Sequence, residues 1–283
     1  MSRRDLYVAV AIATLCGVAL ISGARASEEP GSWPGEHLAP QGPAPNESLL
    51  AFTQTPRRPG NLLGRTGVVR RSAQGRRIVL HQTGDPAWSG EVLVFGCVHG
   101  DECAASGVRP SSALTAGCPD PRSDVYVVPN LNPDGAARGS RLNGRGVDLN
   151  RNFPAGWRPI GERGDPQYSG PRPFSEPETR LAARIVRELE PEVTIWFHQY
   201  GGARPFVRAW GPSLAAGRRF AQLVSLPFHA LPWPDGTAPN WQNHRFPDTA
   251  SFVVELPPGP LAAGLEDRLN DALVRVGRRV SED

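Results

Sequence analysis

One apolar run constrains the fold of this chain more than any other feature. Five of the seven residues at positions 92–98 are apolar, and the other two are Gly96 and Cys97. Such a run is typical of a strand that is buried on both faces of a sheet. It ends abruptly at His99, and Glu102 follows three residues later. Because open α/β sheets bind ligands at the carboxyl edge of their strands, we expect these two side chains to point toward one site.

A second apolar strand ends in the same way. Residues 193–197 are apolar apart from Thr194, and His198 follows them directly. A single histidine in this position is usually a hydrogen-bonded core residue, but here two strands repeat one arrangement. Two histidines and one glutamate are a known ligand set for catalytic zinc, with the fourth position left to water. The sequence therefore predicts that His99, Glu102 and His198 bind one zinc ion.

A carboxylate interrupts a third apolar strand. Glu255 lies within residues 251–256 and has apolar neighbours on both sides. Burying an unpaired charge costs on the order of several kcal/mol. Glu255 therefore either forms a salt bridge or faces a solvent-filled site. Beside the water of a zinc site it would act as a general base.

Apolar strands alternate with helical patterns along residues 61–283. We predict strands at residues 68–71, 77–82, 91–98, 124–129, 193–197 and 251–256, and helices at 101–116, 175–189, 213–225 and 261–280. This alternation predicts one α/β domain, a three-layer α/β/α sandwich with a mixed, largely parallel central sheet. The spacing of Ser175 and Glu178 predicts a capping box. Residues 130–174 lack periodicity, and a loop of this length inside a domain is usually functional.

Composition and charge bound the possible partners. The chain has 283 residues, of which 39% are hydrophobic, which is enough for one large α/β domain or two small ones. Its formal net charge is +3, and all 31 basic residues are arginines that form no dense basic run. This balance does not favour nucleic acid as a partner.

The first 26 residues have the features of a signal peptide. Two arginines precede an apolar run at residues 7–22, and residues 24–26 have the small-x-small form of a cleavage site. The run is shorter than the ~20 residues of a membrane span, so we expect no stable span after cleavage; an uncleaved anchor is the alternative. Either way we expect a secreted protein or one in the cell envelope. Residues 27–60 are rich in proline and glycine and predict a disordered linker.

Three cysteines follow the signal peptide, namely Cys97, Cys103 and Cys118. An odd number leaves at least one of them unpaired. In an oxidising compartment Cys103 could pair with Cys118 or with Cys97, and the sequence does not distinguish the two. We interpret Cys97 as a small buried strand residue rather than a nucleophile.

Five features together resemble the M14 zinc carboxypeptidases. They are HGDE at residues 99–102, NPDG at 132–135, DLNRN at 148–152, His198 and FVVEL at 252–256. They occur in the order found in the family, within a resemblance that extends over residues 62–281, and the bacterial branch that includes the murein-peptide amidases is the most similar. The resemblance implies a zinc carboxypeptidase-like fold and one Zn²⁺ ion, bound by His99, Glu102 and His198.

The resemblance also implies the catalytic residues. Glu255 matches the general base, which takes a proton from water and passes it to the leaving amine. Arg141 matches the arginine that polarises the scissile carbonyl and stabilises the oxyanion, and Arg138 is a weaker match for the same role.

Three further residues match positions that contact substrate. Asn150 and Arg151 match the pair that binds a substrate carboxylate, a task that suits a planar guanidinium. Tyr200 matches a substrate-contacting tyrosine. The digestive members have a mobile tyrosine before the base, but residues 231–234 contain no tyrosine. This departure favours a bacterial hydrolase of cell-wall peptides over a digestive enzyme.

We therefore predict a secreted zinc metallocarboxypeptidase or amidase that hydrolyses an amide bond next to a free carboxylate in peptides, including peptidoglycan peptides. An alternative is a deacylase of N-acyl amino acids, similar to succinylglutamate desuccinylase and aspartoacylase, which resemble this fold and share a similar ligand pair. The NPDG segment and the secretion signal favour the peptidase. A zinc-retaining binding protein without turnover is the third reading, but it would not need Glu255 and Arg141.

Overall fold

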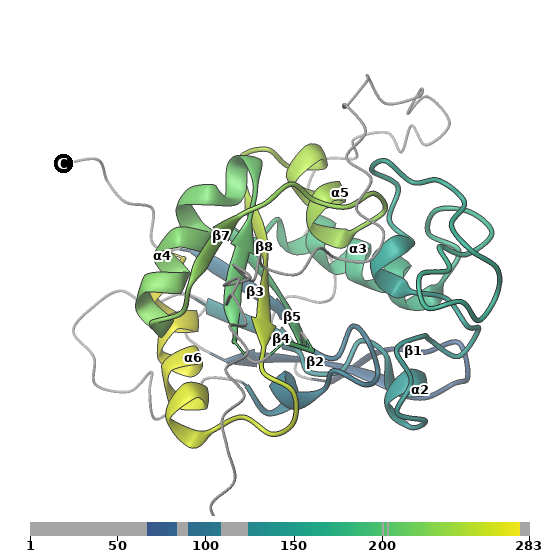
Figure 1. Ribbon diagram of the computed structural model, residues 1–283, viewed down its shortest axis with the longest axis horizontal. Coiled ribbons are helices and arrows are strands. Elements are labelled where there is room, and N and C mark those ends of the chain that lie inside the picture. The colour runs from purple at the N-terminus through teal and green to yellow at the C-terminus, as the bar shows by residue number, and fades with distance from the viewer. Residues whose placement is uncertain (1–66, 84–89, 109–123, 200, 203, 278–283) are drawn as a thin grey trace, which may run out of the picture. The chain divides into compact units, whose positions relative to one another are not determined.

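Eight strands of the described chain form one mixed sheet (Figure 1). The computed structural model describes residues 67–83, 90–108, 124–199, 201–202 and 204–277, all of which belong to one compact unit. The strands are β1 (Gly67–Arg71), β2 (Arg77–Thr83), β3 (Glu91–Phe95), β4 (Asp124–Val128), β5 (Val193–Gln199), β6 (Phe206–Ala209), β7 (Phe228–Ala230) and β8 (Ala250–Leu256). Their order in the sheet is β1-β2-β4-β3-β5-β8-β6-β7.

The centre of the sheet is parallel and its flanks are mixed. Strands β4, β3, β5 and β8 are consecutive parallel neighbours. On one side β2 and β1 continue the sheet in antiparallel pairs, and on the other side β6 pairs antiparallel with β8 and parallel with β7. Parallel strands end at the same edge of a sheet, so the residues that follow β3 and end β5 and β8 share one edge.

Helices cover both faces of the sheet. They are α2 (Pro133–Ala136), α3 (Pro177–Leu189), α4 (Leu214–Val224), α5 (Ala238–Arg245) and α6 (Ala263–Arg275), with short 3-10 turns η2 (Ala104–Gly107), η3 (Leu149–Arg151) and η4 (Gly211–Ser213). Helices α4 and α6 lie on one face, and α3 and α5 lie on the other (Figure 1). The predicted three-layer α/β/α sandwich with a mixed, largely parallel sheet is confirmed.

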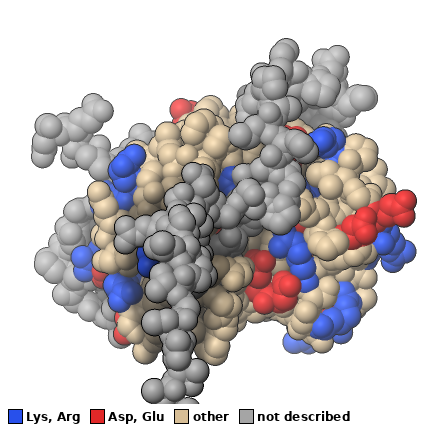
Figure 2. All heavy atoms as spheres, viewed as in Figure 1, with Lys and Arg blue, Asp and Glu red and all other residues tan. Residues whose placement is uncertain are grey.

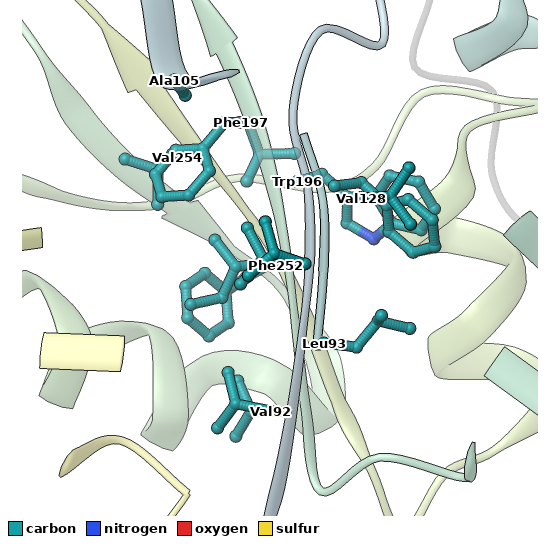
Figure 3. Packing of buried hydrophobic residues seen from close by; sticks show 14 of the residues in the cluster. Val92, Leu93, Ala105, Val128, Trp196, Phe197, Phe252 and Val254 are labelled. Atoms are coloured by element: carbon teal, nitrogen blue, oxygen red, sulfur yellow. The ribbon is translucent and has the colours of Figure 1, made fainter. Parts of the chain in front are cut away.

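Alternation along the central strands divides the core between the two faces. Leu93, Val128 and Trp196 point to one side of the sheet, and Val92 and Phe252 point to the other (Figure 3). All five are at most 2% exposed. Because side chains alternate with a period of two, His198 lies on the same face as Trp196. The ring of Trp196 stacks on Phe95 with 4.2 Å between ring centroids, which fills the core directly beneath this edge.

Most of the predicted elements are confirmed with small changes of boundary. The N-terminal hairpin, the central strands and helices α3, α4 and α6 all form. Strand β3 ends at Phe95 rather than at residue 98, because the backbone at Cys97 turns to a φ of 49°. Strand β5 extends to Gln199 and includes His198 within it.

Three local predictions are wrong. No helix begins at Asp101: residues 101–103 are loop, only the 3-10 turn η2 follows, and the rest of the helix predicted to residue 116 lies outside the described residues. The capping box at Ser175 does not form, since its hydroxyl donates to the Glu176 carboxylate instead. Helix α5 forms where we expected a Pro-rich loop, with prolines at its start. Strands β6 and β7 were not predicted.

The predicted long loop at residues 130–174 is largely irregular and is held by buried amides. Asn152 is fully buried. Its side-chain nitrogen donates to the carbonyls of Ser169 (2.8 Å) and Arg172 (3.0 Å), and its oxygen accepts from the backbone nitrogen of Glu176 at 3.2 Å. These bonds satisfy loop backbone that no sheet or helix satisfies.

The remaining expectations concern the chain ends and the surface. The signal peptide at residues 1–26 and the linker at 27–60 lie outside the described residues and stay predictions. Within the described part, no helix has the length and hydrophobicity needed to cross a membrane. On the face shown in Figure 2, basic and acidic side chains form small separate patches among uncharged residues.

Candidate metal centre and active site

A tight loop after β3 carries His99 and Glu102. The backbone nitrogen of Glu102 donates to the carbonyl of His99 at 3.1 Å, which brings the two side chains to one side of the turn. A glycine is required inside this loop, because a Cβ atom on Gly100 would lie 2.1 Å from the carbonyl carbon of Gly135. Gly135 in turn donates its backbone nitrogen to the side chain of Asn132, 2.9 Å away. The HGDE and NPDG motifs therefore pack directly against each other, through the backbones of Gly100 and Gly135.

The three predicted metal ligands lie within direct contact of one another. The Nδ1 atoms of His99 and His198 are 3.1 Å apart. Glu102 Oε1 is 3.0 Å from the Nδ1 of His99, and Glu102 Oε2 is 2.9 Å from the Nδ1 of His198. In a tetrahedral zinc site with bonds of ~2.0–2.1 Å, ligand atoms are about 3.3 Å apart. The donor types and their spacing therefore fit a zinc ion.

Asp148 lies behind the candidate metal ligands and was not predicted as a site residue. It is fully buried, and its Oδ1 is 3.0 Å from His99 Nε2 while its Oδ2 accepts from Arg141 Nη2 at 2.8 Å. A carboxylate in this position fixes the orientation of the imidazole and leaves Nδ1 to face the site. Its signal in the sequence was its place in the DLNRN motif.

Burial and neighbouring charges shift the pKa values of the ligand cluster. Burial lowers the pKa of His99, but the carboxylates of Glu102 and Asp148 outweigh it and raise that pKa above its ordinary value. Burial lowers the pKa of His198. Although burial opposes it, the two imidazoles hold the pKa of Glu102 well below its usual range, so this carboxylate is ionised.

Glu255 lies beside this cluster on the neighbouring strand. It is the register partner of His198 in the parallel pair of β5 and β8. Its side chain is buried, with 4% exposed. Burial, and then the nearby Glu102 carboxylate, raise the pKa of Glu255 to about 8. A carboxyl group that exchanges its proton near neutral pH is suited to general acid–base chemistry.

Of the two candidate arginines, only Arg141 reaches the ligands. Its Nη1 is 3.2 Å from Glu102 Oε1 and 3.1 Å from His99 Nδ1. The Nε of Arg141 donates to the carbonyl of Pro166 at 3.0 Å, which fixes the guanidinium at the edge of the cluster. The guanidinium of Arg138 instead donates to the carbonyl of Asn143 at 2.9 Å.

The predicted carboxylate-binding pair lies next to the same cluster. Asn150 Nδ2 is 3.3 Å from His198 Nε2, and Asn150 Oδ1 accepts from the backbone nitrogen of Ala238 at 2.9 Å. Arg151 follows in η3, and its Nη1 donates to the backbone carbonyl of Asn150 at 2.9 Å. Tyr200 lies outside the described residues.

Gln199 is a second residue that sequence reasoning missed. Its backbone nitrogen donates to Glu102 Oε2 at 3.1 Å, and its side-chain oxygen accepts from the backbone nitrogen of Ala104 at 2.9 Å. It therefore links the end of β5 to the loop after β3. Its position directly after His198 was the one signal in the sequence.

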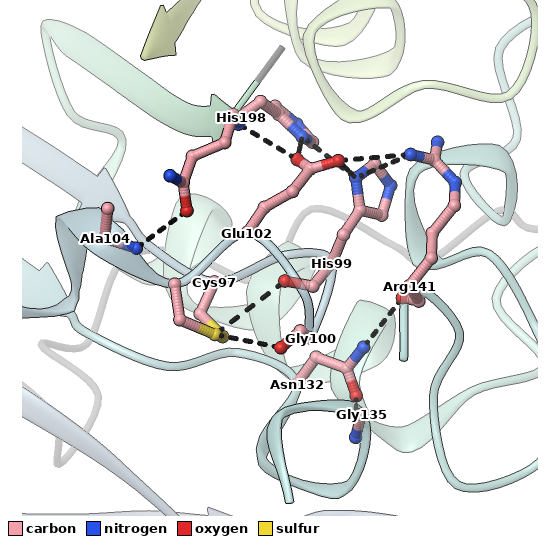
Figure 4. The surroundings of a disulfide bond; sticks show 11 residues. Cys97, His99, Gly100, Glu102, Ala104, Asn132, Gly135, Arg141 and His198 are labelled. Atoms are coloured by element: carbon pink, nitrogen blue, oxygen red, sulfur yellow. Dashed lines mark hydrogen bonds and ion pairs between the residues drawn. A yellow bond between two sulfur atoms is a disulfide. The ribbon is translucent and has the colours of Figure 1, made fainter. Parts of the chain in front are cut away.

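One of the two open cysteine pairings is present. Cys97 and Cys103 form a disulfide directly beneath the ligand loop (Figure 4). Cys97 is fully buried, as expected, but it is bonded rather than a free strand residue. Cys118 lies outside the described residues.

Comparisons with known proteins show similarity to carboxypeptidases and murein peptide amidases. Residues 121–210 match the family model described as zinc carboxypeptidase. This segment contains Arg141, Asn150, Arg151 and His198, while the loop after β3 and Glu255 lie outside it. Murein peptide amidase A of Escherichia coli K12 is 38% identical over 117 residues, which are 38% of this chain and 48% of the relative. Carboxypeptidase B of Astacus astacus is 32% identical over 108 residues, or 31% of this chain and 35% of the relative.

The fold is also shared with solved structures. Murein-tripeptide amidase MpaA from Escherichia coli O157 is 26% identical, with a TM-score of 0.59 over 76% of this chain and 94% of that one. Carboxypeptidase A from Helicoverpa armigera, at 20% identity and a TM-score of 0.56, covers 74% of this chain and 64% of that one and shows the fold alone. In sequence, the chain spans about half the length of the murein peptide amidase it matches. Part of the sequence and the overall fold are therefore similar to those of zinc carboxypeptidases.

Proposed function

We propose that the protein is a zinc-dependent hydrolase that cleaves an amide bond next to a free carboxylate in peptides. The observation that carries this proposal is the convergence of His99, Glu102 and His198 with Glu255 at one edge of the sheet. The three ligand groups lie 2.9–3.1 Å from one another, and Glu255 is the register partner of His198. A binding protein would need only the ligands, whereas this site also holds a carboxyl group suited to proton transfer.

The residues around the ligands have distinct tasks in this reaction. A bound zinc ion would supply a Lewis acid and an activated water. The Glu255 carboxylate accepts a proton from the attacking water and delivers it to the leaving amine. The Arg141 guanidinium, with its side chain 27% exposed at the edge of the cluster, stabilises negative charge on the carbonyl oxygen. Asn150 and Arg151 bind the free carboxylate of the substrate and fix the position of the scissile bond.

The preferred substrates are peptides with a free carboxylate, including bacterial cell-wall peptides. The names of two relatives support this choice, since they are described as murein peptide and murein-tripeptide amidases. The protein acts outside the cytoplasm in this proposal. The signal-like N-terminus supports that location, and so does the Cys97–Cys103 disulfide, because disulfides persist in oxidising compartments.

Two substitutions separate metal binding from proton transfer. We expect Glu255→Gln to retain zinc but to lose about 10²–10⁴-fold in kcat, because the amide cannot accept a proton. We expect His198→Ala to lose both zinc and activity, because one ligand is gone. Elemental analysis and an assay against C-terminal peptides and muropeptides, with and without chelator, measure both quantities. Normal turnover by Glu255→Gln, or full zinc content in His198→Ala, would remove that residue from its assigned role.

The raised pKa of Glu255 predicts a pH dependence of stability in chelated protein. A carboxyl group with a folded pKa of about 8, against an ordinary value of 4.5, binds its proton more tightly when folded. Its stabilising contribution is therefore complete at low pH and is lost as the pH rises through about 8. Between about pH 5 and about pH 8, the free energy of unfolding of wild type in urea should fall by at least ~1 kcal/mol relative to that of Glu255→Gln. Parallel stability curves for the two proteins would contradict this assignment.

Arg151 provides a test of the substrate carboxylate. We expect Arg151→Ala to raise KM about 10–100-fold for a peptide with a free carboxylate, because a charge-assisted hydrogen bond contributes about 1.5–3 kcal/mol. An amidated peptide should be affected much less. Arg151→Lys is the matched control, since it keeps the charge but loses the bidentate geometry. Its KM for the peptide with a free carboxylate should lie between those of wild type and Arg151→Ala. Equal effects on both peptides would refute the carboxylate-binding role.

A further inference from the structure

A disulfide closes the loop that carries two of the three metal ligands. Cys97 precedes His99 by two residues, and Cys103 directly follows Glu102. The two cysteines are six positions apart in sequence, and their Cα atoms lie 4.4 Å from each other. Figure 4 shows the bridge beneath the side chains of His99, Glu102 and His198. The ring that the disulfide closes spans residues 97–103 and therefore contains His99 and Glu102.

The two ends of this loop are anchored unequally. On the Cys97 side, the chain leaves β3, Cys97 is fully buried, and its carbonyl accepts from the backbone nitrogen of Asn132 at 3.1 Å. On the Cys103 side, the chain enters the four-residue 3-10 turn η2, where the Ala104 backbone nitrogen donates to the Gln199 side chain. The disulfide thus ties a weakly anchored turn to the end of a central strand.

Within the ring, few backbone hydrogen bonds hold the chain. Between the two cysteines, two backbone hydrogen bonds within the described residues hold the loop: Glu102 donates to the His99 carbonyl at 3.1 Å, and Gly100 donates to the Arg141 carbonyl at 3.4 Å. The side chain of His99 is fixed from behind by Asp148 and is only 3% exposed. That of Glu102 is 13% exposed and accepts from the Gln199 backbone nitrogen and from Arg141, two partners that lie outside the ring. Opening the ring would free the backbone of Glu102 to move away from these two partners, whereas His99 would keep its contact with the buried Asp148.

We propose that Cys97 and Cys103 are positioning residues of the metal site, and that their disulfide holds Glu102 in the geometry for zinc binding. Zinc affinity then depends on the redox state of this pair. The inference rests on the proposed zinc site and adds a control of that site by thiol–disulfide chemistry. Reduction breaks the sulfur–sulfur bond and gives two thiols. An external dithiol supplies the two hydrogens and becomes a disulfide, whereas a phosphine takes the oxygen of a water molecule, becomes a phosphine oxide, and leaves the two hydrogens of that water to the thiols.

The size of the expected effect follows from preorganisation. A ring of this length removes backbone freedom that a linear segment must lose when it binds the ion. Loss of contacts that orient metal ligands typically weakens metal binding about 10–100-fold. The backbone of His198 lies within β5, outside the ring, so the sheet and not the disulfide positions it. Reduction should therefore weaken zinc binding in that range, rather than abolish the fold or the whole site.

The test measures zinc dissociation constants of the full-length protein by chelator competition. Wild type is measured oxidised, after reduction with a phosphine, and after reoxidation. The Cys97→Ser/Cys103→Ser double variant is measured with and without the phosphine, and Cys118→Ser is the matched control that removes a cysteine outside the pair. Circular dichroism and urea unfolding of each chelated protein establish that it is folded. The visible spectrum of the Co²⁺ form reports the ligand geometry directly.

We expect a 10–100-fold rise in the dissociation constant on reduction, reversal on reoxidation, the same rise in the double variant, and no change in Cys118→Ser. The Co²⁺ spectrum should change on reduction and in the double variant, and should return to its original form on reoxidation. A purely structural disulfide would lower the urea midpoint but leave zinc affinity and the Co²⁺ spectrum unchanged, and that result overturns the proposal. Tighter binding after reduction also overturns it, because the free thiols would then be ligands. Absence of zinc binding by oxidised wild type would instead refute the proposed function.

Discussion

The parallel pairing of β3, β5 and β8 is the constraint on which the rest of the structure depends. Parallel neighbours end at one edge, so groups that follow or end these strands meet there although they are far apart in sequence. The register sets His198 of β5 against Glu255 of β8, and β3 delivers the ligand loop beside them. A shift of one residue in β8 would turn Glu255 to the opposite face of the sheet.

Burial of charge is what makes this edge chemically useful. Glu102, Asp148 and Glu255 lie close together, and such carboxylates repel one another in a medium of low polarity. The structure offsets this repulsion with the two imidazoles and with Arg141, whose guanidinium contacts both Glu102 and Asp148. Glu255 has the least compensation and therefore has a raised pKa, while Glu102 stays ionised. One cluster thus holds two glutamates in different states, one suited to binding a metal ion and one suited to proton transfer.

The sequence was most informative where the physical signal is strong. Apolar runs predicted the central strands, and the histidines after two of them predicted the groups that the structure brings together. It was least informative for short elements: β6 and β7 have four and three residues, too few for a periodic pattern. The helix expected from Asp101 failed because the disulfide and the close approach of Gly100 to Gly135 impose a turn. Asp148 was missed because its partners, His99 and Arg141, meet it through loops whose paths no local pattern encodes.

The central claim is that two imidazoles and one carboxylate bind a single zinc ion. X-ray absorption at the zinc edge of the purified, oxidised protein tests it most directly. We predict about four nitrogen or oxygen ligands at ~2.0–2.1 Å, with the multiple-scattering signature of two imidazoles and no sulfur. Sulfur ligands at ~2.3 Å, which would place the cysteines rather than the histidines on the metal, would contradict the account.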